Sequence, residues 1–162
     1  MLPLLISVGL RGEEEARVTC RDAGCEPSGA HGDPAGIRVL LVDDHPLVRT
    51  ALAERLSTED DLTVVGECAD GSEVVEAAAR LHPDVVCMDL SMPTMDGFTA
   101  TEAVRAAQLD VRVVVLTGSP ITPVEAAAAG ADALVPKSAR PDALLHCVRS
   151  VAAGASGCPY CL

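Results

Sequence analysis

The sequence predicts an α/β fold: a doubly wound, five-stranded parallel sheet with helices on both faces. Between residues 37 and 154, five short apolar segments alternate with five segments of helical periodicity, and this order is typical of parallel strands joined by right-handed crossovers. Hydrophobic residues form 49% of the 162-residue chain but aromatic residues only 1%, so Val, Leu and Ala must build the core. That composition suits buried parallel strands covered by Ala-rich helices.

The length of the chain allows one ordinary domain with extensions. Residues 1–36 have no sustained period and end in a Gly/Pro-rich stretch, which predicts a disordered extension and linker. Residues 37–154 form the domain, and residues 155–162 are expected to be a short, loose tail. Residues 2–10 are apolar but lack the basic start and cleavage site of a secretory signal, and no run is long enough to span a membrane. We therefore expect a cytoplasmic protein without a membrane partner.

The first half of the domain predicts three strands and two helices. A strand over 37–42 precedes a helix over 46–56, and a mixed strand over 62–67 is expected at the sheet edge. A second helix starts at Asp70, with Glu73 three residues later as in a capping box, and runs to about Leu81. A third strand covers 85–89. The first helix carries its apolar residues at helical spacing: Leu47, Val48, Ala51, Leu52 and Leu56.

The second half predicts two more strands and three helices. A helix over 98–107 leads to a strand over 111–116 that is expected to be fully buried. Thr122, Pro123 and Glu125 are suited to the start of a short helix that stops at Gly130. A strand over 131–135 and a helix from Pro141 to near Gly154 complete the domain. The first, third and fourth strands are the most apolar, so we expect them in the centre of the sheet.

Polar residues stand where these strands end. Asp43 and Asp44 follow the first strand, Asp89 ends the third, Thr117 follows the fourth, and the fifth runs into Lys137. Because the carboxyl ends of parallel strands meet at one edge, these side chains should converge there. Three carboxylates need a cation to offset their repulsion, and Mg²⁺ is the common choice for such oxygen ligands. An ionised Asp beside Mg²⁺ and a lysine can attack phosphorus and hold an acyl phosphate.

Two longer strings carry a family resemblance. L-L-V-D-D-H-P-L-V-R over 40–49 and M-D-L-S-M-P-T-M-D-G over 88–97 resemble the receiver domains of two-component response regulators, in particular the NarL/FixJ type. The resemblance covers residues 37 to about 153 and implies a flavodoxin-like sheet of order 2-1-3-4-5. It implies that Asp89 is the phospho-acceptor, that Thr117 is the switch hydroxyl and that Lys137 binds the phosphate.

The same resemblance implies a magnesium site. Asp44 and Asp89 would bind Mg²⁺ with the backbone carbonyl of Ser91, and Asp43 would help largely through water. The implied function is a phosphorylation switch: a sensor histidine kinase donates a phosphoryl group to Asp89, with no enzymatic activity beyond Mg²⁺-dependent self-phosphorylation and slow hydrolysis of the aspartyl phosphate. The surface from the fourth to the fifth helix would then bind a downstream protein or a second copy of the chain.

Two departures from the resemblance concern output. The family carries a switch aromatic three residues before the lysine, where this sequence has Leu134. NarL-type relatives continue into a DNA-binding helix-turn-helix, whereas this sequence stops at Leu162. The net charge of −12 is opposite in sign to the basic surface with which proteins bind nucleic acids, so we expect no direct nucleic-acid binding. A receiver-type module that works constitutively through its surface is therefore an alternative to the switch.

The cysteines offer two further alternatives. Seven cysteines, several of them in apolar segments, fit a reducing compartment better than a disulfide framework. C-P-Y-C, from Cys158 to Cys161, looks like a glutaredoxin motif, but no helix can follow it to lower a thiol pKa, so a thiol-redox function is disfavoured. A Cys₄ zinc site of Cys20, Cys25, Cys158 and Cys161 would need both loose ends to meet.

Overall fold

The computed structural model describes residues 36–155 and 158–162, so the predicted extension lies outside the described residues except for Gly36. Five strands form one parallel sheet in the order β2-β1-β3-β4-β5, as predicted. The strands are β1 (Ile37–Val42), β2 (Leu62–Cys68), β3 (Val85–Asp89), β4 (Arg112–Thr117) and β5 (Ala133–Pro136). The helices are α1 (Pro46–Ser57), α2 (Val74–Leu81), α3 (Gly97–Ala106), α4 (Pro123–Ala128) and α5 (Pro141–Ala152), and a 3₁₀ turn, η1 (Gly71–Glu73), precedes α2.

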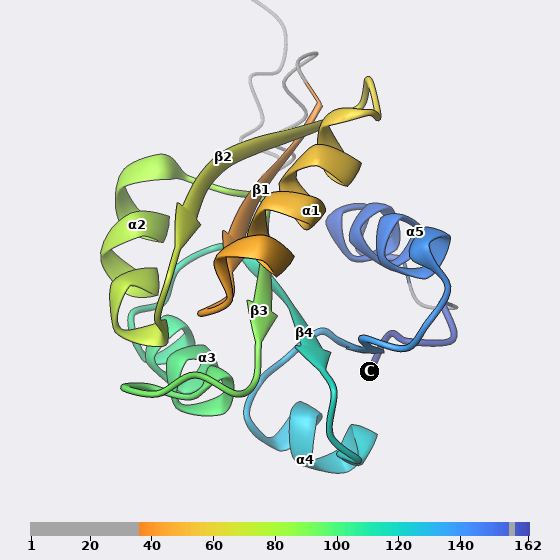
Figure 1. Ribbon diagram of the computed structural model, residues 1–162. Helices are drawn as coiled ribbons and strands as arrows, with labels where there is room; N and C mark the ends of the chain where they lie inside the picture. Colours follow the sequence, from red (N-terminus) through yellow and green to blue (C-terminus); the bar gives the residue numbers. More distant parts are fainter. Residues whose placement is uncertain (1–35, 156–157) are drawn as a thin grey trace, which may run out of the picture. The chain divides into compact units, whose positions relative to one another are not determined.

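The sheet separates two hydrophobic cores (Figure 1). Helices α2, α3 and α4 cover one face, and α1 and α5 cover the other. Successive side chains of a strand point to opposite faces, so each central strand serves both cores. In β3, Val86 and Met88 belong to the first core, whereas Val85 and Cys87 belong to the second. All five residues of β3 are buried, including the carboxylate of Asp89 at its end.

Local signals in the sequence set several helix starts. Thr122 and Glu125 start α4, as predicted, and form a capping box in which each side chain accepts from the backbone N–H of the other residue. Asp96 caps α3 by accepting from the N–H groups of Phe98 and Thr99, both at 2.9 Å. These caps start α3 and α4 at the carboxyl edge of the sheet.

Helix α1 differs from its prediction. Leu47 is 86% exposed, Val48 is also exposed, and Leu56 is the one buried residue of the helix. The first turn of α1 follows the end of β1 after three residues, so it extends past the strands and has no sheet beneath it to cover. The apolar face that the spacing predicts is therefore buried only toward the end of the helix.

The C-terminal tail is not loose, and that expectation was wrong. Residues 160–162 run antiparallel along the outer edge of β5, with a bridge between Ala133 and Cys161. The N–H of Leu134 donates to the carbonyl of Tyr160 at 2.9 Å, and the N–H of Leu162 donates to that of Asp132 at 2.9 Å. An edge strand offers unpaired backbone groups, and the tail pairs with one of those of β5, the N–H of Leu134.

The helices in the described part of the chain are too short or too polar for any of them to cross a membrane.

Candidate functional site

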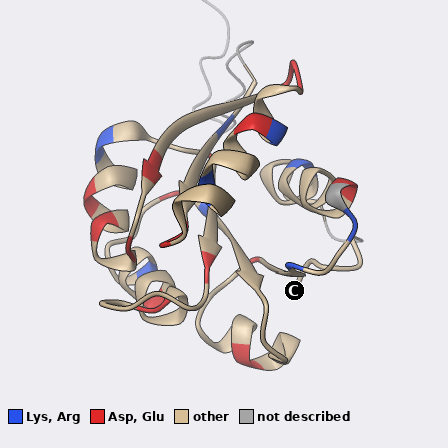
Figure 2. Ribbon diagram, in the orientation of Figure 1, with Lys and Arg blue, Asp and Glu red and all other residues tan. Residues whose placement is uncertain are grey.

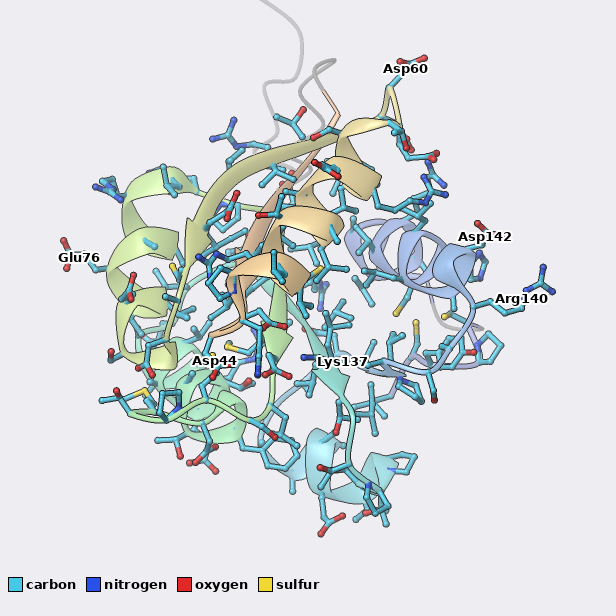
Figure 3. The ribbon with its side chains drawn as sticks, in the orientation of Figure 1. Asp44, Asp60, Glu76, Lys137, Arg140 and Asp142 are labelled. Atoms are coloured by element: carbon cyan, nitrogen blue, oxygen red, sulfur yellow. The ribbon has the colours of Figure 1, made fainter. Side chains whose placement is uncertain are left out.

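The acidic centre consists of Asp43, Asp44, Asp89 and Lys137 at the carboxyl edge of the sheet. Asp43 and Asp44 directly follow β1, Asp89 ends β3, and Lys137 follows β5. Since the sheet order makes β1 the neighbour of β3, the carboxylates of the two strands come together as predicted. The red segments of the ribbon in Figure 2 mark acidic residues at the ends of β1 and β3, and Figure 3 shows Asp44 and Lys137 on the same edge.

Lys137 bridges two buried carboxylates. Its Nζ lies 2.8 Å from Oδ1 of Asp89 and 2.9 Å from Oδ2 of Asp43. The side chains of Asp89 and Asp43 are 3% and 1% exposed, whereas that of Lys137 is 30% exposed. Burial alone would lower the pKa of Lys137, but the bonds to Asp89 and Asp43 outweigh it and raise the pKa above its usual value. Lys137 is also the only lysine of the chain.

The neighbours of Asp43 fix its position. Its Oδ1 accepts the backbone N–H of His45 at 2.8 Å, and its carbonyl accepts from the guanidinium of Arg49. Arg49 also binds Glu67 on β2 through Nε at 3.0 Å. Sequence reasoning missed Arg49, because an arginine in a helix is usually solvent-exposed; its position in the first turn of the helix that follows β1 is the signal that could have found it.

The arrangement of the acidic centre fits a hard divalent cation. Oδ1 of Asp44 is buried and has no hydrogen-bond partner. Nδ1 of His45 lies 2.8 Å from this oxygen, but their orientation does not make a hydrogen bond. Ligand atoms of Asp43, Asp44, His45 and Asp89 all lie within 4.8 Å of one another. A buried carboxylate oxygen without a donor, among other carboxylates, is a site that Mg²⁺ can satisfy.

Two further residues, Thr117 and Ser91, were predicted for the site. The hydroxyl of Thr117 exchanges hydrogen bonds with the backbone of Ser119, both at 3.0 Å, so its own loop holds it. The carbonyl of Thr117 accepts the backbone N–H of Lys137 at 2.7 Å, which links the ends of β4 and β5. Ser91 is exposed in the loop two residues after Asp89, and its part in metal binding stays a prediction.

Contacts of Asp70 and Gly97 fix the position of the loop that follows Asp89. The carboxylate of Asp70 accepts the N–H groups of Ser72, Thr94 and Met95 at 2.9, 3.0 and 3.4 Å. These bonds lower the pKa of Asp70 to about 2, and the bond from Ser72 contributes most. At Gly97, a Cβ atom would collide with the carbonyl oxygen of Asp89. The sequence marked Asp70 as a helix cap, but it gave no sign that the same carboxylate holds a loop 24 residues away.

Comparison with known proteins agrees with this site. Residues 39–149 match the response regulator receiver domain. The chain belongs to this family. The matched region covers the first core, most of the second core and the whole acidic centre, from the end of β1 to Lys137. The predicted family and the predicted flavodoxin-like fold are thereby confirmed.

Two curated relatives show the extent of the similarity. The nitrate/nitrite response regulator NarL of Escherichia coli K12 is 38% identical over 118 residues, which cover 72% of this chain and 55% of NarL. The response regulator GacA of Pseudomonas aeruginosa is 39% identical over 121 residues, which cover 73% of this chain and 56% of GacA. The chain therefore spans little more than half the length of these relatives.

Solved structures give the same result. A two-component response regulator of the LuxR family from Aurantimonas sp. SI85-9A1 superposes with a TM-score of 0.72 at 31% identity, over 76% of this chain and 91% of that one. The response regulator domain of CheB from Thermotoga maritima superposes with a TM-score of 0.67 at 30% identity, over 73% and 97%.

Proposed function

We propose that the receiver is a phosphorylation switch in which Asp89 accepts a phosphoryl group from the histidine of a sensor kinase. The observation that carries this proposal is the bridge from Lys137 to two buried carboxylates, beside a buried Asp44 oxygen that accepts no hydrogen bond. A purely structural ion pair would not leave a third buried carboxylate oxygen unsatisfied. The combination suits a site that awaits a cation and a phosphoryl group.

Each residue of the acidic centre has a separate role in the phosphoryl transfer. One carboxylate oxygen of Asp89 attacks phosphorus in line, the P–N bond to the donor histidine breaks, and the imidazole leaves with the bonding pair and then takes a proton. Lys137 holds Oδ1 of Asp89 before the reaction and offers its charge to a phosphoryl oxygen afterwards. When bound through Asp44, Asp89, Ser91 and Asp43, Mg²⁺ supplies charge that offsets the phosphoryl oxygens. Water later hydrolyses the acyl phosphate.

The first turn of α1 supports a docking surface for the kinase. Leu47 and Val48 are exposed there, directly after His45 and the acidic centre. A groove of about 380 Å³ continues from Val48 between α1 and α5 to Lys137. A donor histidine must approach this edge of the sheet, and exposed apolar residues beside it give a partner helix something to bury.

Output through the surface from α4 to α5 remains our proposal for a downstream protein or a second copy of the chain. The family's aromatic position is Leu134, which is buried in the core beneath α4. A leucine there cannot signal by rotating a ring between buried and exposed positions. We therefore propose a partial switch, in which Thr117 must first leave the backbone of Ser119 to reach the phosphate.

The experiment is to incubate the protein with acetyl phosphate and Mg²⁺ and to record its intact mass. We expect one phosphoryl group in the wild type, none without Mg²⁺, and none in Asp89→Asn. The Asp110→Asn variant, which removes a carboxylate outside the acidic centre, serves as the control and should be phosphorylated like the wild type. Absence of a phosphorylated species, with far-UV circular dichroism showing a folded protein, would favour the constitutive receiver-type module instead.

A further inference from the structure

A second cluster of chemically active side chains lies on the other core, away from the acidic centre. The thiol cluster consists of Cys147 on α5 and of Cys158 and Cys161 in the C-terminal tail. Their sulfur atoms all lie within 4.8 Å of one another. Cys147 is fully buried, Cys158 is 8% exposed, and Cys161 is half-buried. The tail thus places the thiols of Cys158 and Cys161 beside that of Cys147 on α5.

Packing alone does not explain this convergence. Cys68 and Cys87 act as small core residues at separate places, each at the end or in the middle of a strand. In the thiol cluster, by contrast, the turn from Cys158 to Cys161 points a backbone donor at sulfur: the N–H of Tyr160 lies 3.5 Å from Sγ of Cys158. A backbone N–H that points at sulfur is a contact that a metal-bound cysteine can accept. The thiolate is the form that binds a metal.

We propose that Cys147, Cys158 and Cys161 bind one Zn²⁺ ion. Thiolate sulfur is the ligand that zinc prefers in structural sites, and water or one further ligand would complete the four-coordinate shell. Zn–S bonds of about 2.3 Å in a tetrahedron separate the sulfurs by roughly 3.8 Å, which the 4.8 Å limit of the cluster allows. On binding, each of the three thiols releases its proton to solvent, so no oxidant or reductant is needed.

Redox chemistry fits the thiol cluster less well. Burial raises the pKa of Cys147 and of Cys161, so without a metal these thiols stay protonated and are poor nucleophiles. Among the described residues, Cys158 opens no helix that could oppose this effect. The zinc site also differs from the disfavoured alternative that the sequence offered: Cys147 takes part, whereas Cys20 and Cys25 lie outside the described residues.

The zinc ion would fasten the tail to the receiver. Cys161 forms a bridge with Ala133 of β5, and the same strand leads to Lys137. Leu162 lies at the start of β5: its N–H donates to the carbonyl of Asp132, and it lines a pocket together with Arg112, the first residue of β4. Occupancy of the site would therefore hold the tail across the β5 edge, inside the surface from α4 to α5.

The test uses the full chain, purified under a non-metal-binding reductant. Zn²⁺ is titrated against a chromogenic chelator, and Co²⁺ replaces it to report thiolate ligands by a charge-transfer band in the near ultraviolet. We expect one Zn²⁺ per chain, a thiolate band with Co²⁺, and the loss of both in Cys147→Ser and in Cys161→Ser. Cys68→Ser is the matched control, a buried thiol outside the cluster, and should bind like the wild type.

Two measurements distinguish a variant that has lost a metal ligand from one that has misfolded. Far-UV circular dichroism and phosphorylation by acetyl phosphate should be unchanged in Cys161→Ser, whose side chain is half-buried. The proposal is overturned if the reduced protein binds no Zn²⁺, if Cys147→Ser still binds it while Cys20→Ser does not, or if only Cu(I) binds. A disulfide within the cluster in the freshly purified, unreduced protein, with no metal present, also overturns it.

Discussion

Replacement of Lys137 by methionine tests how the acidic centre is balanced. The substitution keeps most of the side-chain length but removes the only Lys or Arg side chain that contacts the carboxylates of Asp43 and Asp89 among the described residues. Both carboxylates then remain buried without a counter-charge and repel each other. The isolated receiver should therefore lose stability at pH 7 in the absence of divalent cations.

The size of the loss follows from the burial of the three groups. Breaking a fully buried ion pair costs about 3–5 kcal/mol, because the remaining charge has no partner. Lys137 is 30% exposed, so water screens part of the interaction and a loss of about 2–3 kcal/mol is expected. For a domain of this size, that loss corresponds to a fall in Tm of roughly 8–12 °C.

The assay is urea unfolding followed by circular dichroism, with and without Mg²⁺. Mg²⁺ should stabilise Lys137→Met more than the wild type, because it offsets carboxylates that the lysine no longer reaches. Arg80→Met removes an exposed cation of α2 and is the matched control, with an expected change below about 0.5 kcal/mol. A Lys137→Met variant as stable as Arg80→Met, or one indifferent to Mg²⁺, would refute this account of the acidic centre.

Three further predictions concern the surroundings of the site. The lowered pKa of Asp70 stabilises the folded protein above the unfolded pKa of this group, and that contribution is lost as the pH falls through about 2. Asp70→Asn lacks the contribution from the start, so acid-unfolding curves should show a smaller loss of stability between pH 4 and pH 2 than in the wild type. Gly97→Ala should destabilise the receiver by about 1–3 kcal/mol in urea and slow phosphorylation of Asp89, whereas Gly118→Ala, where a Cβ meets no atom within 4 Å, should do neither. Asp44→Asn should weaken Mg²⁺ binding at least tenfold by calorimetry, since it neutralises the unpartnered carboxylate; unchanged affinity would contradict the assignment.

The sequence predicted the fold and the acidic centre because both depend on strong local patterns. Apolar runs of strand length identified the central strands, and the rule that parallel strands end at one edge was enough to group Asp43 and Asp89 with Lys137. The capping box at Thr122 and Glu125 was equally local, with both partners within one helical turn.

The remaining features depend on contacts that leave no period in the sequence. Three residues of the tail are too few to show strand alternation, so their pairing with β5 could not be foreseen. The same holds for Cys147, which reads as one apolar residue of α5 until the tail brings Cys158 and Cys161 beside it. The exposure of Leu47 had a related cause, since helical spacing indicates which residues share a face and not how far the sheet extends beneath it.

Asp89, and no other carboxylate of the acidic centre, should receive the phosphoryl group. The most direct measurement is to treat the phosphorylated protein with borohydride, which reduces an acyl phosphate to an alcohol, and to locate the reduced residue by peptide mass spectrometry. Our account predicts reduction at Asp89 alone, dependent on prior phosphorylation with Mg²⁺. Reduction at Asp43 or Asp44, or at no residue of a protein that carries phosphate, would contradict it.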